Sequence, residues 1–241
     1  MTHHHGHEAH HRALDLDAEV FGAQLTQVLD RLGDLTPRRV VDLGAGTGAG
    51  TRLLRERYPD ATVTAVDNDP RALDVLRQQG FAVLQADLDA GFPQVADVDL
   101  VWAASSLHHV ADPAGLLAGA RAALAPGGTL VVVEVEGLPA FTGHPAEERG
   151  RAAALASGWN HHPDWTPVLQ AAGFSVTRTD TTLQAPSSAA AQEYARTWLP
   201  RYLHVPGLAG QDRRALTELL DDLPGAEPRA TRAVWIAEVD R

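Results

Sequence analysis

The chain has 241 residues and a formal net charge of −11; it contains no cysteine, and all its basic residues are arginine. The missing cysteine excludes disulfides, thiolate nucleophiles and zinc–thiolate sites, and the missing lysine excludes a lysine base or Schiff base. A surface with this excess of negative charge repels a phosphate backbone, so we expect no nucleic-acid partner.

The N-terminal segment is polar and rich in histidine, with six of the twelve histidines among its first eleven residues. Such a segment cannot pack as a core, so we expect residues 1–13 to be mobile. Apolar residues then recur at helical spacing from Leu14 to Leu32, which predicts a helical segment over residues 14–36. No apolar run is long enough to span a membrane and no secretory pattern is visible, so we expect a cytoplasmic protein without a membrane partner.

The central part of the chain alternates apolar strands with helical segments. We expect strands over residues 40–43, 61–66, 81–85, 98–103 and 129–135. Helices are expected from the glycine-rich turn to Arg57, from Pro70 to Gly80, and from Pro113 to the residue before Pro126. Strands that alternate with helices pair in parallel through right-handed crossovers, which predicts a doubly wound α/β sheet.

The C-terminal part is less regular. Residues 137–165 gather Gly, Pro, His and Trp and show no periodic pattern. We expect a short helix over 166–172, a strand over 174–181, two or three helices within 186–223 and a last strand over 230–239. We therefore expect a single domain over residues 14–241, in which residues 137–165 and 186–223 cover a site.

The strongest local motif is VVDLGAGTGAG at residues 40–50, a glycine-rich turn between a strand and a helix. Glycines at such a turn let a ligand approach the backbone and the N-terminus of the helix. Taken alone the motif is ambiguous, because Gly44, Gly46 and Ala49 also fit the G-x-G-x-x-G/A fingerprint of nicotinamide enzymes. A tight turn in an ordinary α/β protein is a third possibility.

Three carboxylates follow this motif at the ends of successive strands. Asp42 lies within the first strand, where it would face the ammonium of an amino-acid cofactor. Asp67 ends the second strand 19 residues after Gly48, close to the offset of an acid that binds ribose hydroxyls. Asp87 ends the third strand, where it could accept from an adenine amino group. Each acid alone could be a solvated residue, but the ordered set favours a cofactor with these three parts.

With two further segments, DLVWAASSLHHVADP and LAPGGTLVVVE, these motifs resemble the class I S-adenosylmethionine-dependent methyltransferases, nearest to the small-molecule methyltransferase type 11/12 group, over residues 38–136. The resemblance implies a Rossmann-like, seven-stranded, mostly parallel sheet with the last strand antiparallel. It also implies S-adenosyl-L-methionine as cofactor and S-adenosyl-L-homocysteine as product. The expected cofactor residues are Asp42, Gly44, Gly46, Gly48, Asp67, Asn68, Asp87, Leu88 and Ala104.

The sequence after the fourth strand restricts the acceptor. It reads Ala-Ala-Ser-Ser, unlike the Asn-Pro-Pro-Tyr type found where exocyclic amines are methylated, and we see no acids that resemble a magnesium site. We predict in-line methyl transfer to a small molecule with an oxygen, nitrogen or carbon nucleophile, no metal, and an acceptor site covered by residues 137–165 and 186–223. Two alternatives stay open: a cofactor-binding protein that does not methylate, acting as a scaffold or in another reaction, and an NAD(P)-dependent oxidoreductase. The oligomeric state is left open.

Two groups of side chains are candidates for contact with the acceptor. His108 and His109 follow the fourth strand, at the edge where open α/β sheets place ligands, so either is a candidate base, His108 ahead of His109; the alternative is a pair of packing histidines. The segment from Trp159 to Trp165 suits an acceptor pocket or an anchored loop equally well. The stripe from Tyr194 to His204 is typical of core packing.

Overall fold

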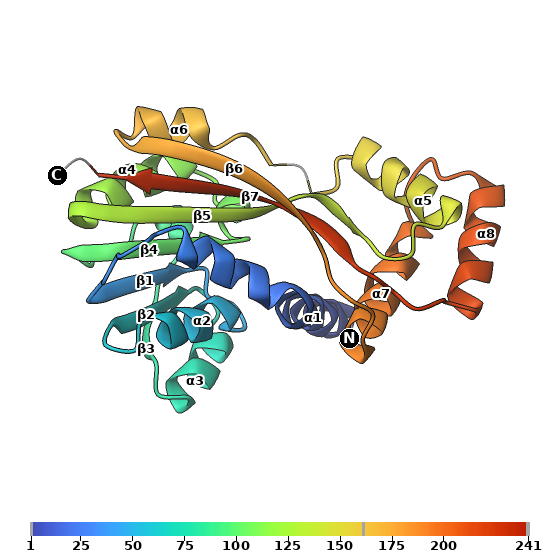
Figure 1. Ribbon diagram of the computed structural model, residues 1–241, viewed down its shortest axis with the longest axis horizontal. Helices are drawn as coiled ribbons and strands as arrows, with labels where there is room; N and C mark the ends of the chain where they lie inside the picture. The colour runs from blue at the N-terminus through green and yellow to red at the C-terminus, as the bar shows by residue number, and fades with distance from the viewer. Residues whose placement is uncertain (1, 161, 240–241) are drawn as a thin grey trace. The chain divides into compact units, whose positions relative to one another are not determined.

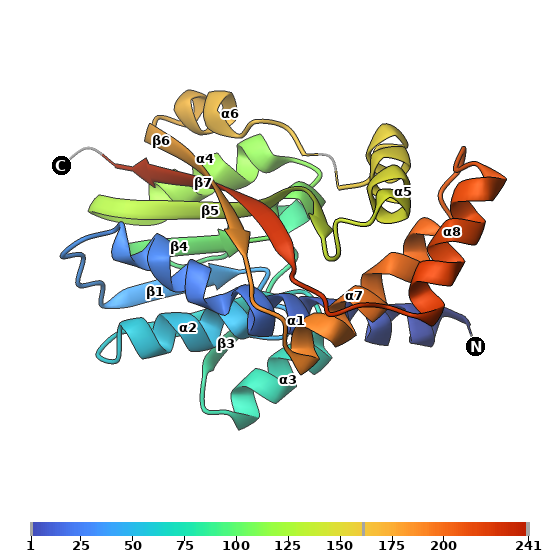
Figure 2. The same ribbon diagram turned by 45° about the vertical axis from the view of Figure 1, so that its right-hand side comes forward.

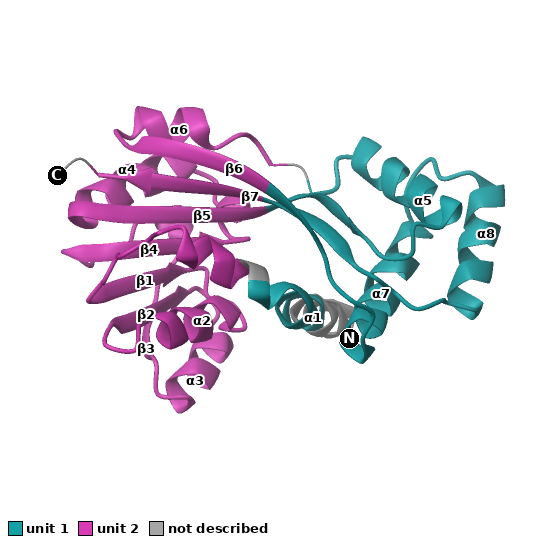
Figure 3. Cartoon of the chain, in the orientation of Figure 1, with its two compact units in different colours: residues 1–24, 135–161, 181–232 teal, residues 25–134, 162–180, 233–241 magenta. Residues whose placement is uncertain are grey.

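The computed structural model describes residues 2–160 and 162–239, and for residues 2–11 and Gln24 it describes the backbone only. The chain divides into two compact units, which Figure 3 shows in different colours. Unit 1 comprises residues 1–24, 135–161 and 181–232, and unit 2 comprises residues 25–134, 162–180 and 233–241. Three strands and one helix run through both units, so neither unit is a single continuous segment. The prediction of one domain over residues 14–241 stays a prediction.

The sheet has seven strands in the order β3-β2-β1-β4-β5-β7-β6 (Figure 1). The strands are β1 (Arg39–Leu43), β2 (Thr62–Asp67), β3 (Ala82–Gln85), β4 (Val98–Ala104), β5 (Leu124–Ala140), β6 (Ser175–Gln184) and β7 (Arg229–Glu238). Strands β1 to β5 pair in parallel. Unit 2 also contains α2 (Ala49–Arg57), α3 (Pro70–Gln78), α4 (Pro113–Ala123), α6 (Thr166–Ala171) and the short 3₁₀ helices η1 (Leu88–Ala90) and η2 (Leu107–His109).

The last strand runs against its neighbours. The N–H of Val239, just after β7, donates to the carbonyl of Gly128 near the start of β5, at 3.0 Å. The N–H of Ala185, just after β6, donates to the carbonyl of Pro228, just before β7, at 2.8 Å. A strand whose end meets the beginning of its neighbour is antiparallel to it. The predicted Rossmann-like sheet, with its last strand antiparallel, is confirmed.

Local sequence explains where two helices of unit 2 begin. The Asp69 carboxylate accepts the N–H of Arg71 and Pro70 takes the first turn of α3. The Asp112 carboxylate accepts the N–H of Gly115 in α4, where Pro113 has the same role. An aspartate followed by proline satisfies a free N–H and sets the helical φ, so both helices begin where the sequence predicts.

Unit 1 has a separate hydrophobic core. Helices α5 (Pro145–Ala156), α7 (Ala189–Tyr202) and α8 (Gly210–Asp221) pack against one another (Figure 2). Tyr194 and Tyr202 are buried in this core, and Tyr194 meets the ring of Phe141 edge-on with centroids 5.2 Å apart. The prediction that the aromatic stripe of this segment packs as core is confirmed for these two tyrosines.

Several boundaries differ from the sequence prediction. Helix α1 spans Thr2–Asp30, so its backbone is helical well before residue 14; the side chains of residues 2–11 lie outside the description and the mobility of this segment stays a prediction. Helix α5 occupies a stretch that was predicted to be irregular. The prediction was wrong here because the Ala- and Arg-rich sequence has no apolar stripe that would indicate a helix. Strand β5 continues five residues beyond the expected end at residue 135. No helix within the described part of the chain has the length and apolar character needed to cross a membrane.

Candidate functional site

The turn after β1 requires glycine at its three alternate positions. Gly44, Gly46 and Gly48 all have positive φ, at 67°, 50° and 81°. A Cβ added at Gly44 would lie 2.6 Å from the Cβ of Ser106, and one at Gly48 would lie 2.2 Å from a methyl group of Leu76. A side chain at either position would therefore collide with Ser106, just after β4, or with Leu76 in α3. The turn is compact, and its backbone is left uncovered by side chains of its own.

Asp67 connects this turn to the end of β2. One carboxylate oxygen accepts the N–H of Gly46 at 2.8 Å, and the other accepts the N–H of Asp69 at 2.9 Å. Each oxygen has a second lone pair that can accept from a ligand hydroxyl. Asn68, the next residue, is exposed. The structure therefore brings together the glycine turn and the acid predicted to bind ribose.

Asp42 lies beneath the turn, with only 2% of its surface exposed. The hydroxyl of Thr51 donates to its carboxylate at 2.6 Å. Burial raises the pKa of Asp42 to about 6; the hydrogen bond from Thr51 opposes this rise and the charge of Asp67 adds to it. A Cβ at Gly50 would lie 3.2 Å from a carboxylate oxygen of Asp42, so glycine leaves room beside the acid. That Asp42 faces a ligand ammonium stays a prediction.

The other predicted cofactor residues lie at the ends of β3 and β4. Asp87 is exposed and accepts the N–H of Asp89 at 3.0 Å, while Leu88 packs against the main core of unit 2. Ala104 is half-buried and ends β4. Ser105, which follows it, has a φ of 52°, a conformation that costs a non-glycine residue strain and that gathers at functional sites. The sequence did not single out Ser105.

His108 is paired with a buried acid that the sequence analysis missed. Its Nδ1 lies 2.8 Å from one oxygen of Glu134, and its backbone N–H donates to the other oxygen at 3.3 Å. The Glu134 side chain is 1% exposed and that of His108 is 25% exposed. His109 is exposed, with its ring centroid 4.0 Å from that of His108. Glu134 directly follows the apolar run of the fifth expected strand, and this position is the sequence signal that could have identified it.

Comparison with known proteins gives a match in the same region. Residues 41–132 match the family model described as "Methyltransferase domain". The chain is 38% identical over 135 residues to a trans-aconitate 2-methyltransferase of Acidovorax sp. (strain JS42), which covers 55% of this chain and 50% of that protein. It is 34% identical over 155 residues to the protein of the same name from Mycobacterium sp. (strain KMS), which covers 64% of this chain and 57% of that protein. The chain thus spans about half the length of these curated relatives.

A solved structure shows the same fold. It is Haemonchus contortus phosphoethanolamine N-methyltransferase 2 in complex with phosphomonomethylethanolamine and S-adenosylhomocysteine, with a TM-score of 0.57 at 15% identity, covering 94% of this chain and 56% of that chain.

Residues 41–132 match a methyltransferase domain, and the seven-stranded sheet has the fold of the class I S-adenosylmethionine-dependent methyltransferases.

The residues around the glycine turn fit S-adenosylmethionine, the cofactor that the domain match implies. All the predicted cofactor residues lie in unit 2, at or just after the ends of strands β1 to β4, which run in parallel, so they share one edge of the sheet. Beside Gly44, the hydroxyl of Ser106 is buried and has no hydrogen-bond partner among the described residues. A buried hydroxyl without a partner next to an open glycine turn is consistent with a polar ligand there.

The aromatic segment after α5 is divided between the two units. Trp159 is half-buried in unit 1, with its ring centroid 6.3 Å from that of Tyr202. Trp165 is buried in the core of unit 2, where Asp164 accepts the indole N–H of Trp235 at 3.1 Å. His161, predicted to lie in the acceptor pocket, lies outside the described residues. Trp165 is thus anchored in a core, and whether this segment lines an acceptor pocket stays a prediction.

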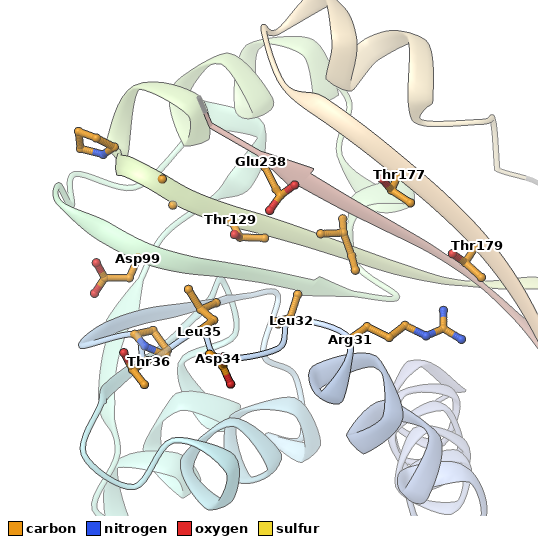
Figure 4. Close-up of a pocket in the computed structure, with 15 residues that line it drawn as sticks. Arg31, Leu32, Asp34, Leu35, Thr36, Asp99, Thr129, Thr177, Thr179 and Glu238 are labelled. Carbon is orange, nitrogen blue, oxygen red and sulfur yellow. The ribbon is translucent and has the colours of Figure 1, made fainter. Parts of the chain in front are cut away.

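An open cavity of about 690 Å³ lies in unit 2 (Figure 4). Asp99 at the start of β4, Thr129 in β5 and Glu238 at the end of the antiparallel β7 line it. This is the opposite edge of the sheet from the glycine turn, so the cavity is not the cofactor site. Within the described part of the chain, no group of three or more His, Asp or Glu side chains could hold a metal ion.

Proposed function

We propose that this protein transfers a methyl group from S-adenosylmethionine to a small-molecule acceptor and releases S-adenosylhomocysteine. The observation that carries the proposal is the contact of Asp67 with the N–H of Gly46, because it holds the acid predicted to bind ribose against the glycine turn. The cofactor, when bound, supplies an electrophilic methyl carbon on a sulfonium sulfur. The task of the chain is to hold donor and acceptor in line.

Each part of the site has a proposed role in binding. The glycine turn admits the amino-acid part of the cofactor, and the free lone pairs of Asp67 accept from its ribose hydroxyls. Asp42, in its ionised form, pairs with the ammonium group. Asp87 accepts from the adenine amino group, and Leu88 offers it an apolar contact. Asn68 and Ala104 complete the contact surface at the ends of their strands.

The acceptor side is proposed more coarsely. His108 or His109 contacts the acceptor, because both follow β4 at the edge of the sheet that carries the cofactor residues. The names of the curated relatives make trans-aconitate a first compound to test. That residues 137–165 and 186–223 cover the acceptor stays a prediction, as do the cytoplasmic location and the absence of nucleic-acid and membrane partners.

A ligand screen by thermal unfolding tests this proposal against its rivals. A ligand that binds only the native state raises the melting temperature, so S-adenosylhomocysteine should stabilise the protein and NAD(P) should not. Stabilisation by NAD(H) without stabilisation by S-adenosylhomocysteine would reverse the proposal in favour of an oxidoreductase. Binding of S-adenosylhomocysteine with no turnover on a broad acceptor panel would favour a protein that binds the cofactor without methylating.

A further inference from the structure

The pair formed by His108 and Glu134 has a geometry that packing alone does not require. Glu134 lies in β5 directly after three buried valines and is itself 1% exposed. A carboxylate in such a place is costly unless its oxygens are hydrogen-bonded. One oxygen accepts the backbone N–H of His108, which is the structural contact. The other oxygen, 2.8 Å from the imidazole Nδ1, is committed to the side chain of His108.

The acid determines which ring nitrogen of His108 carries the proton. An ionised carboxylate only accepts, so Nδ1 must carry a proton, and in the neutral ring Nε2 is then the nitrogen with the lone pair. The side chain of His108 is 25% exposed, so it is reachable from outside the core, whereas Glu134 is not. Among the described residues, the carboxylate of Glu134 and the ring of the exposed His109 both contact this ring.

We propose that Glu134 is a positioning residue that holds His108 as a base through Nε2, and that the acceptor atom therefore carries a proton, which a hydroxyl gives up as the new bond forms and an ammonium gives up before its nitrogen attacks. This inference rests on the proposed function and narrows its substrate class. A carboxylate acceptor is already ionised at neutral pH and needs no base. The pair of Glu134 and His108 therefore distinguishes this chain from an enzyme that needs only to bind an ionised carboxylate acceptor.

The proton and charge balance supports a buried acid behind the histidine. As the acceptor forms its bond to the methyl carbon, the carbon–sulfur bond breaks and its electron pair stays on sulfur. The proton of the acceptor moves to Nε2 of His108. The positive charge of the sulfonium is thus replaced by that of an imidazolium, and Glu134 stabilises this new charge at 2.8 Å.

Turnover of three acceptor panels tests the inference. Hydroxyl compounds, amines and carboxylic acids including trans-aconitate are supplied with S-adenosylmethionine, and formation of S-adenosylhomocysteine is measured. We expect turnover of hydroxyl or amine compounds, and a fall in kcat of about a hundredfold or more in both Glu134→Gln and His108→Gln. The kcat of the double variant should be no lower than that of the more impaired single variant, because the two residues act as one unit. The dissociation constant of S-adenosylhomocysteine should stay within about twofold of the wild-type value.

Glu56→Gln is the matched control, since Glu56 is an exposed acid on α2 of the same unit; it should behave as wild type. Turnover confined to carboxylic acids, or a Glu134→Gln variant with at least half the wild-type kcat, would overturn the inference. If no compound is turned over, ¹⁵N NMR of the histidines decides. A neutral His108 protonated on Nδ1 supports the inference, and one protonated on Nε2 overturns it. Failure of the proposed function looks different, because then neither S-adenosylmethionine nor its product binds.

Discussion

Asparagine at position 42 is expected to make the ligand-free protein more stable and its cofactor binding weaker. Asp42 is 2% exposed, and in the folded protein its carboxylate accepts a short hydrogen bond from Thr51. Asparagine keeps the shape and can keep the acceptor oxygen, but it removes the buried charge. The charge is useful only when a ligand ammonium is present to pair with it, so the two effects have opposite signs.

The size of the effect follows from the pKa of Asp42. Burial raises it from 3.8 to about 6, so the folded protein disfavours the ionised form. The resulting cost to stability is absent below about pH 4, grows as the pH rises to about 6, and is constant above that. At 1.36 kcal/mol per pKa unit it reaches about 3 kcal/mol at pH 8 and roughly half of that at pH 5. Loss of the charge-assisted bond to the ligand should weaken binding by about tenfold to a hundredfold.

Urea unfolding of wild type and Asp42→Asn at pH 5 and pH 8 measures the stability effect, and calorimetry with S-adenosylhomocysteine measures binding. We expect the variant to be more stable at both pH values, with a gain about twice as large at pH 8 as at pH 5. A variant less stable than wild type at pH 8 would refute the argument about the buried charge. Unchanged affinity for S-adenosylhomocysteine would refute the assignment of Asp42 to the ammonium.

Three further substitutions test other parts of the structure. Gly44→Ala should cost about 2–4 kcal/mol of unfolding free energy, because its Cβ would lie 2.6 Å from that of Ser106 at a φ of 67°; a loss below about 0.5 kcal/mol would contradict the tight turn. Glu147→Gln should cost about 1–3 kcal/mol in urea unfolding, because the buried Glu147 carboxylate accepts the N–H groups of Phe141, Thr142 and Gly143 and an amide offers one oxygen fewer; an unchanged midpoint would argue against this cluster. The hydroxyl of Thr166, followed by its backbone N–H, lowers the pKa of Asp164 to about 2. The contribution of the ionised Asp164 to stability is therefore present above about pH 4 and lost as the pH falls toward 2. We expect this contribution to be less than about 1 kcal/mol, because the Asp164 side chain is about half exposed. The free energy of unfolding of Asp164→Ala should then lie further below that of the wild type at pH 6 than at pH 3. An equal difference at the two pH values would contradict the stabilising role of the Asp164 carboxylate.

The sheet of unit 2 could be predicted because its signals are local. Buried strands appear in the sequence as apolar runs. The starts of helices α2, α3 and α4 are indicated by a glycine turn or by an Asp-Pro pair such as Asp69-Pro70. The cofactor residues follow from the same logic, since the carboxyl ends of parallel strands meet at one edge. The contact of Asp67 with Gly46, 21 residues away in sequence, is a consequence of that meeting.

The features that the sequence analysis missed either depend on contacts between residues distant in sequence or lie in segments without a periodic apolar pattern. Glu134 and His108 are 26 residues apart, and only the pairing of β4 with β5 brings them together. Helix α5 has small and charged residues without an apolar stripe, so periodicity could not find it. Trp165 and Trp159 are close in sequence, yet they pack in the cores of different units, which an aromatic-rich segment does not reveal.

Calorimetric titration with S-adenosylhomocysteine tests the central claim most directly. The account predicts binding by the wild type, and binding about tenfold to a hundredfold weaker in Asp67→Asn, because that carboxylate both accepts from the ligand and holds the N–H of Gly46. Asp60→Asn, at an exposed aspartate in the loop before β2, should bind as the wild type does. A wild type that binds no S-adenosylhomocysteine, or an Asp67→Asn variant with undiminished affinity, would contradict the account.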